Sequence, residues 1–293
     1  MPLVFNPLWF SKSSGVIFGT GIVVIDAGGG STLYDLSNNT TSNSTLITNR
    51  LGTSGTGNTT YALFGGGVSG STVMNSTNKF TYAGSGVTTG TNLTYSSQHG
   101  AATGNATVGV FAGGYNGSTT YNTTSVYTYS GDTTAAGGNL TTQRSNFTGA
   151  GTTTEGVFGG NGFSNVKTTD IYTYSSNTAV AGTNLTYNFD SGGATGNTTV
   201  GVFGGGGTAG GTTNITNIYT YSGNTVTTGT NLSYSDTGQA AAGNSTGGVF
   251  GGGSTNTQKT SLYKFSNNSV TPGTNLASAS FYDSAACSNP GWQ

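Results

Sequence analysis

Short apolar runs that close in glycines recur along this chain at a nearly constant interval. The complete form, Gly-Val-Phe-Gly-Gly-Gly, occupies residues 201–206 and 248–253, and four variants precede it. The phenylalanine of the run recurs about 46 residues apart, at Phe18, Phe64, Phe111, Phe158, Phe203 and Phe250. Valine and phenylalanine suit a half-buried strand, and the glycines permit a turn with positive φ. We therefore expect the end of a strand here, and not a phosphate-binding loop, which would have to open a helix.

The repeating unit is clearest from Gln239 onwards, where it predicts four strands. The first strand is Ala240 to Gly243, the second is Gly248 to Gly253, the third is Ser261 to Phe265, and the fourth is Ser269 to Leu276. Earlier units end their predicted fourth strands in Gly-Thr-Asn-Leu. The third strands carry apolar residues on both faces, as expected of blades that pack face to face around an axis.

This order of a small-residue strand, an apolar strand closing in glycines and a third strand with paired aromatics resembles the kelch repeat. The resemblance covers residues 15–293 and implies an all-β, six-bladed, kelch-like β-propeller with four-stranded blades. The kelch-type tryptophan of the fourth strand is replaced here by the leucine of Gly-Thr-Asn-Leu. The first unit is degraded, because the GVIFGTG of residues 15–21 is followed by an IVVIDAGGG that matches no repeat.

Strand counting suggests how the ring closes. The second strand at Phe18 has no first strand before it in its own repeat, and the last first strand, Ser284 to Ser288, has no second strand after it. Joined together, they would form one blade split between the N- and C-termini. Such closure would leave no open sheet edge around the ring.

Composition excludes several classes of protein. Charged residues make up 5% of the chain and the formal net charge is −1, so the basic surface of a nucleic-acid-binding protein is not expected. The 16 Tyr and 14 Phe provide a core that a disordered chain would not have. Cys287 is the sole cysteine and is interpreted as a small apolar strand residue. No apolar run is long enough to insert into a membrane, and Met1 to Trp9 lacks the features of a signal peptide.

Residues for catalysis are scarce. His99 is the only histidine and Glu155 the only glutamate. The spacing of these and the other titratable residues therefore indicates no catalytic triad, metal cluster or CxxC motif. The copper radical oxidases that share kelch-like propellers need several histidine and tyrosine ligands and a cross-linked cysteine, for which Cys287 is a poor match. We therefore expect no enzyme, no cofactor and no metal.

Two sets of residues are candidates for binding. The first is a polar set just before successive first strands, near the mouth of the axis: His99, Arg144, Asp190, Asp236 and Asp283. This set would either bind an ion, a sugar or a partner, or fix the loops by hydrogen bonds, and the second interpretation is favoured. The second set lies in the long, variable loops between second and third strands, a Tyr/Asn-rich mixture typical of adaptable binding surfaces: Tyr115, Asn116, Tyr121, Phe163 and Asn214.

Many Asn-x-Ser/Thr triplets occur, including those at Asn92 and Asn231. They would imply glycosylation in a secreted protein. The favoured alternative is that asparagine serves turns and threonine serves strands.

Residues 1–14 stand outside the repeat and form a predicted apolar docking arm with Phe5, Leu8, Trp9 and Phe10. The start MPLVFNPL is similar to the short N-termini of bacteriophage fibre proteins. Together with the sparse charge, this predicts a non-enzymatic structural and binding protein of a virion, such as a tail-fibre, spike or decoration protein. Its partners would be other virion structural proteins and a host-surface glycan or receptor. The alternative is an extracellular, secreted carbohydrate-binding or adhesive propeller.

Overall fold

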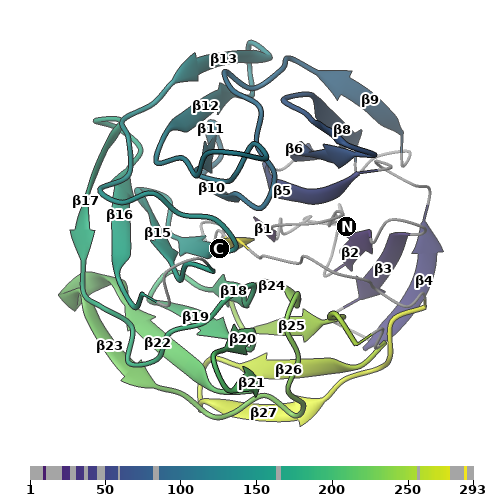
Figure 1. Cartoon of the computed structure of the whole chain (residues 1–293). Helices are drawn as coiled ribbons and strands as arrows, with labels where there is room; N and C mark the ends of the chain where they lie inside the picture. The colour runs from purple at the N-terminus through teal and green to yellow at the C-terminus, as the bar shows by residue number, and fades with distance from the viewer. Residues whose placement is uncertain are drawn as a thin grey trace, which may run out of the picture.

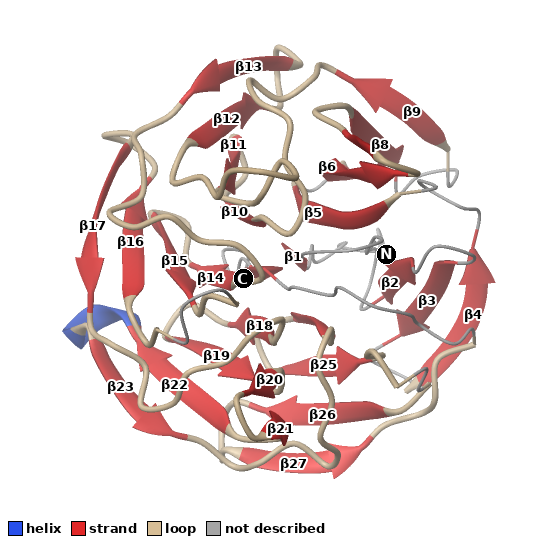
Figure 2. Cartoon of the chain, viewed as in Figure 1, coloured by secondary structure: helices blue, strands red, loops and turns tan. Residues whose placement is uncertain are grey.

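In the computed structural model, antiparallel sheets stand side by side around a central axis as the blades of a β-propeller (Figure 1). The structure describes residues 9–10, 22–26, 31–35, 39–44, 50–58, 60–81, 86–162, 166–255, 258–277 and 287–288. The predicted all-β propeller with four-stranded blades is confirmed. Within the described ranges the one helical element is a single 3-10 turn, Tyr221–Gly223, and no helix is long and apolar enough to cross a membrane (Figure 2).

Five blades have four strands each, and they follow the chain in order. The blades consist of β5 (Leu51–Gly57), β6 (Tyr61–Ser69), β8 (Thr77–Thr81) and β9 (Val87–Gly90); β10 (Ala101–Gly104), β11 (Val108–Ala112), β12 (Thr124–Thr128) and β13 (Thr133–Ala136); β14 (Thr148–Gly151), β15 (Glu155–Gly159), β16 (Thr169–Thr173) and β17 (Thr178–Gly182); β18 (Gly193–Gly196), β19 (Val200–Gly204), β22 (Thr216–Thr220) and β23 (Thr225–Thr228); β24 (Ala240–Gly243), β25 (Gly247–Gly251), β26 (Thr260–Lys264) and β27 (Ser269–Pro272). Short strands β7 (Thr72–Val73), β20 (Gly207–Thr208) and β21 (Gly211–Thr212) lie in the loops between second and third strands.

A three-stranded sheet occupies the remaining place in the ring. It consists of β2 (Ile22–Asp26), β3 (Ser31–Asp35) and β4 (Thr40–Ser44), paired in that order. The segment IVVIDAGGG, which matched no repeat in the sequence, therefore supplies a strand of this blade. The strand predicted around Phe18 lies outside the described residues. Ile and Val replace the usual Gly-Val-Phe here, and this substitution concealed the unit.

The terminal strands lie at the axis and do not join each other in a split blade. β1 (Trp9–Phe10) pairs antiparallel with the inner strand β24, and β28 (Cys287–Ser288) pairs parallel with the inner strand β14. The predicted completion of the first blade by Ser284 to Ser288 is therefore wrong for the described part of this segment. The physical reason is that each inner strand keeps one edge toward the axis, and a short terminal strand satisfies the backbone groups of that edge. Phe5 and Leu8 lie outside the described residues.

Neighbouring blades are joined by a repeated hydrogen-bonded latch. In the turn between third and fourth strands, a residue with positive φ, such as Asn224 or Asn268, accepts a hydrogen bond from the hydroxyl of the third-strand tyrosine. Its Oδ1 also accepts the backbone N–H of a Gly-Thr-Asn-Leu threonine in the preceding blade, at 2.9 Å for both Thr183 and Thr230. Each threonine hydroxyl in turn donates to the backbone oxygen of the same asparagine.

The latch also closes the ring. The backbone N–H of Thr274, in the last blade, donates to Asn39 Oδ1 at 2.9 Å, and the Thr274 hydroxyl donates to the Asn39 backbone oxygen at 2.6 Å. Asn39 belongs to the turn between β3 and β4. Gly-Thr-Asn-Leu was predicted to end the fourth strands, but its Thr, Asn and Leu follow them, because the threonine N–H bonds across to the next blade.

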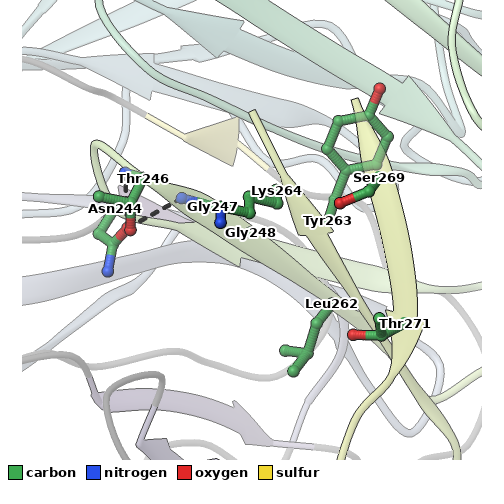
Figure 3. Close-up of a pocket in the computed structure, with 9 residues that line it drawn as sticks. All are labelled: Asn244, Thr246, Gly247, Gly248, Leu262, Tyr263, Lys264, Ser269 and Thr271. Carbon is green, nitrogen blue, oxygen red and sulfur yellow. Dashed lines mark hydrogen bonds between the residues drawn. The ribbon is translucent and has the colours of Figure 1, made fainter. Parts of the chain in front are cut away.

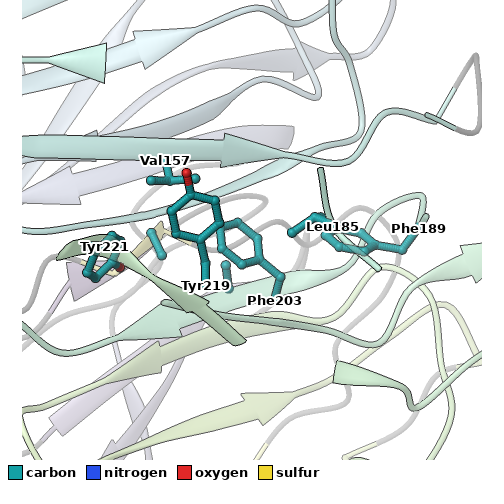
Figure 4. Close-up of a cluster of buried hydrophobic side chains, with 8 residues drawn as sticks. Val157, Leu185, Phe189, Phe203, Tyr219 and Tyr221 are labelled. Carbon is teal, nitrogen blue, oxygen red and sulfur yellow. The ribbon is translucent and has the colours of Figure 1, made fainter. Parts of the chain in front are cut away.

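Aromatic and aliphatic side chains fill the space between blades. One such cluster joins the blades of β14 to β17 and β18 to β23, with Phe203 at its centre and wholly buried (Figure 4). Its buried members are Ala150, Val157, Leu185, Phe189, Ala194, Phe203, Tyr219 and Tyr221. Leu185, in Gly-Thr-Asn-Leu, is 2% exposed, so this leucine packs within the seam between the two blades.

Glycine at the end of the second strand is required by backbone geometry. Gly205 has φ of +68°, and a Cβ atom built there would overlap the side chain of Gln239. Replacing Gly205 with valine is therefore expected to lower the free energy of unfolding by about 1–3 kcal/mol. Chemical denaturation of the two proteins measures the difference. The same substitution at Gly210, which has no such φ and meets only the Thr208 hydroxyl, is the matched control. Equal effects at both positions would contradict the assignment.

Candidate functional site

The loops from second to third strands and from fourth to first strands share one end of the propeller, here called the loop face. The turns from first to second and from third to fourth strands lie at the opposite end. Those turns are tight, and their polar groups form hydrogen bonds with nearby residues. Asn105, for example, accepts the N–H groups of Thr107 and Val108 at 2.9 and 3.0 Å and donates to the Thr153 carbonyl. The longer loops, which vary most between blades, therefore lie on the loop face.

A series of backbone hydrogen bonds, here called the backbone ring, links the five four-stranded blades near the axis on the loop face. Each member has positive φ and lies three residues before the first-strand residue that pairs with the phenylalanine of the second strand. The members are Gly52, His99, Asn146, Ser191 and Gly238. From His99 onwards, the N–H of each member donates to the carbonyl of the previous member, at 2.7–2.9 Å, so four hydrogen bonds link the five members. The members share no side-chain type, so the sequence carries no single signal for this ring.

The predicted polar ring is not a ring of equivalent side chains. His99 belongs to the backbone ring itself, Asp190 lies one residue before its ring member, and Arg144 and Asp236 lie two residues before theirs. Asp283 lies outside the described residues. Only the backbone repeats at this point, so the charged residues fall at different offsets from the ring members. The favoured interpretation, loop fixing, remains a prediction for the set as a whole.

Arg144 lies in a fully buried structural network. Its Nε donates to Asp170 Oδ2 at 2.8 Å, and its Nη1 donates to the carbonyls of Gly160 and Thr168 at 3.0 and 2.8 Å. Both side chains of the ion pair are 0% exposed. Burial lowers the pKa of Arg144, and the charge of Asp170 opposes that effect. This pair ties the loop between β15 and β16 to the blade and is closed to solvent.

Asp236 is also buried. It accepts the N–H of Thr237 at 2.8 Å and hydroxyls of Ser254 and Thr255 at 3.2 and 2.6 Å. Three neutral donors therefore hold this carboxylate, and they fix the loop that follows β25. Asp190 accepts the hydroxyl of Ser191 at 2.8 Å and is half-buried.

Three of the predicted loop residues form one ordered loop between β11 and β12. Asn116 Oδ1 accepts the N–H groups of Ser118 and Thr119 at 3.0 and 2.8 Å, and Asn116 Nδ2 donates to the Tyr121 hydroxyl at 2.5 Å. The Tyr115 hydroxyl donates to the Gly117 carbonyl. The loop is thus preorganised, with its tip at Gly117, Ser118 and Thr119 exposed.

A neighbouring tyrosine anchors this loop from below. The ring of Tyr95 meets that of Tyr121 edge to face, with centroids 5.3 Å apart, and the Tyr95 hydroxyl donates to the carbonyls of Gly113 and Thr123. Burial raises the pKa of Tyr95, so this phenol stays neutral. Tyr115 and Tyr121 are half-buried, and each offers part of its ring to solvent.

Asn214, another predicted loop residue, does not join them. Asn214 Nδ2 donates to the Leu232 carbonyl at 2.9 Å, as Asn75 and Asn122 do to Leu93 and Leu140. The Asn214 side chain therefore makes a structural hydrogen bond that recurs in other blades. Phe163 lies outside the described residues.

Two cavities are associated with the last blade. One of about 300 Å³ is lined by Asn244, Thr246, Leu262, Tyr263, Lys264 and Thr271 together with neighbouring glycines and Ser269 (Figure 3). Its polar end belongs to the turn between β24 and β25, where Asn244 Oδ1 is already occupied by Thr246 and Gly247 N–H groups. The other, of about 280 Å³, opens on the loop face beside Tyr234.

Comparisons with known proteins show the fold alone. No protein-family model matches the chain, and no curated protein sequence matches it. A solved structure described as a novel fungal alcohol oxidase with catalytic diversity among the AA5 family, in complex with copper, is similar with a TM-score of 0.60. The identity is 16%, and the match covers 95% of this chain and 68% of that one.

The residues of this chain do not fit a copper centre. Proteins hold copper with clustered imidazole, thiolate and thioether side chains, and the sequence has one histidine, one cysteine and two methionines. Within the part of the chain that the structure describes, no three His, Cys, Asp or Glu side chains come together. We derive no chemistry through copper.

The prediction of a bacteriophage virion protein is wrong by this comparison, because the structural likeness is to a fungal oxidase. Its compositional argument also has another explanation. Low charge with abundant Thr, Asn and Gly is what the latches, turns and blade-to-blade packing described above require.

Proposed function

We propose that the protein is a non-catalytic binding propeller that recognises a partner through its loop face. The observation that carries this is the preorganised loop between β11 and β12. Asn116 fixes the backbone of its tip, and Tyr95 supports Tyr121 from below. Rigid aromatic side chains lose little conformational entropy on binding. Because this loop is already ordered, it would lose little conformational entropy when it binds a partner.

The placement of ionisable groups supports the same proposal. Catalysis needs titratable groups that reach a substrate. Arg144, Asp170 and Asp236 are each 0% exposed and hydrogen-bonded within the fold. Lys79 and Asp132 pair at 2.5 Å on the outer flank, where Asp132 takes the latch position of the asparagines. Although burial opposes it, the hydrogen bonds from Lys79 and Thr91 lower the pKa of Asp132.

Site-specific photo-cross-linking tests the proposal. A photoreactive amino acid replaces Ser118, at the exposed tip of the loop, and in a second protein it replaces Ser130, in the turn at the opposite end of the same blade. In extracts of the source cells and their medium, the Ser118 probe is expected to form one defined adduct that Ser130 does not. Adding Asn116→Ala, which frees the tip, is expected to reduce that adduct at least about fivefold.

Two results would contradict the proposal. Equal adducts from both ends of the blade, or an adduct that survives Asn116→Ala unchanged, would remove the loop face as the binding surface. Turnover of primary alcohols with peroxide release, by the chain loaded with copper, would overturn the non-catalytic assignment.

A further inference from the structure

The cavity of about 300 Å³ beside Lys264 lies at the opposite end of the propeller from the loop face (Figure 3). It is bounded by the turn between β24 and β25 and by strands β26 and β27 of the last blade. Such a volume accommodates one small molecule. Because the cavity does not involve the loop between β11 and β12, a ligand here is separate from the function proposed above.

The cavity opens on one face of the last blade. Leu262 and Lys264 lie two residues apart on β26, so their side chains share this face. Their cross-strand neighbours on β27 are Thr271 and Ser269. In the blade of β14 to β17, the corresponding face, which carries Ile171, packs against the following blade. The cavity therefore lies on the side of the last blade where the ring is closed by the latch described above.

Two directly opposed positions at this cavity differ from those in every other four-stranded blade. Gly247 and Lys264 pair across β25 and β26. The pairs at this place in the other blades are Tyr61 with Thr81, Val108 with Thr128, Glu155 with Thr173, and Val200 with Thr220. The last blade thus has a glycine in place of a larger side chain and a lysine in place of a threonine. Four blades form without this lysine, so the blade fold itself does not require it.

Lys264 provides a cation that the described part of the chain does not neutralise. Lys79 pairs with Asp132 at 2.5 Å, and Lys167 donates to the Thr186 carbonyl at 2.9 Å. By contrast, the Lys264 side chain is exposed and makes no ion pair or hydrogen bond with the described residues. Its ammonium group is therefore available to an anion in the cavity.

Asn244 adds an amide donor to the lining. Its Oδ1 already accepts two backbone N–H groups, which leaves its Nδ2. In two other blades the equivalent Nδ2 donates to the following blade, from Asn105 to the Thr153 carbonyl at 2.9 Å and from Asn197 to the Ser245 carbonyl at 3.4 Å. Within the described ranges Asn244 Nδ2 has no such acceptor.

The rest of the lining suits the carbon chain of an organic molecule. Leu262 is half-buried and provides an apolar surface. The hydroxyls of Thr246 and Ser269 already donate to Asn244 and Asn267, at 2.6 and 2.8 Å. The positive charge and the amide donor are therefore the main polar features that the cavity offers to a ligand.

We propose that this cavity binds a small monocarboxylate with an apolar body. Lys264 provides the positive charge for the carboxylate, and Asn244 Nδ2 donates a hydrogen bond to it. Leu262 covers the carbon chain. One cation with one amide donor matches the single negative charge of a carboxylate, whereas a phosphate dianion would leave negative charge uncompensated.

Titration of the full chain with 4-methylpentanoate, followed by NMR, tests this proposal. Saturable shifts are expected for Gly247, Leu262 and Lys264, with weaker binding of 4-methylpentanamide, which lacks the charge, and of acetate, which lacks the apolar body. Lys264→Thr, which matches the other four-stranded blades, is expected to weaken binding at least about fivefold, whereas Lys264→Arg keeps the charge and most of the affinity. The matched control is Lys167→Thr, which removes an exposed lysine from another blade.

Each remaining outcome would overturn the assignment. Absence of saturable shifts, or binding of the amide or acetate as tight as that of 4-methylpentanoate, would show that the cavity does not select such an acid, and this comparison needs no variant. Equal losses in Lys264→Thr and Lys167→Thr, or in Lys264→Thr and Lys264→Arg, would remove the lysine charge as the determinant. Lys264 is exposed, so its variants should fold, and unchanged melting temperatures verify this.

Discussion

Replacing Arg144 with methionine is expected to lower the free energy of unfolding by about 3–5 kcal/mol. Arg144 and Asp170 are both wholly buried, and their charged atoms are 2.7 Å apart. Methionine has a similar volume and fills the space, but it leaves the carboxylate of Asp170 without its cation and three backbone or hydroxyl acceptors without their donor. An unpaired buried charge is far more costly than a missing apolar contact.

Chemical denaturation of four proteins separates the charge effect from packing. They are the natural chain, Arg144→Met, Asp170→Asn and the double variant, and the double variant should lose less than the sum of the single losses. The control is Lys79→Met at the partly exposed pair with Asp132, where a loss of about 0–1 kcal/mol is expected. A loss below about 1 kcal/mol for Arg144→Met would show that water reaches Asp170 and that the pair is not a closed structural network.

Replacing Phe203 with alanine is expected to cost about 3–5 kcal/mol of unfolding free energy. Phe203 is 0% exposed and packs against Phe189 and Tyr219, with ring centroids 6.5 Å from each (Figure 4). Because it bridges two blades, its removal opens a cavity in a seam that neither blade can close alone. Thermal melting and denaturant titration measure the effect.

Two further variants calibrate this expectation. Phe203→Leu should cost less than alanine, because it keeps most of the apolar volume. Val180→Ala, on the outer strand β17 where Val180 is 56% exposed, should change stability by no more than about 0.5 kcal/mol. If Phe203→Ala behaved like Val180→Ala, the blades would not be stabilised by packing at their seams.

The repeat was sufficient to predict the propeller because each blade is a local unit. Phe111, Phe158, Phe203 and Phe250 all lie in second strands, each paired with a preceding small-residue strand. Tyr115, Asn116 and Tyr121 lie within one loop because they are close in the chain, and their role in binding stays a prediction. Where the contacts of an element are made by residues close in the sequence, the local sequence pattern predicts that element.

The sequence by itself determined the all-β class and the blade repeat, since strand pairing and turn geometry depend on residues close in the chain. Only the tertiary structure decided which ends pair with which strands, because β1 and β28 meet β24 and β14 across the axis. The same is true of Arg144, whose partner Asp170 belongs to another strand. It is true also of the Thr274–Asn39 latch, which joins residues 235 positions apart. The terminal pairings and the Thr274–Asn39 latch arise from closure of the ring, so a single repeat carries no information about them. The Arg144–Asp170 pair arises within one blade, where folding brings the loop into β14 against β16.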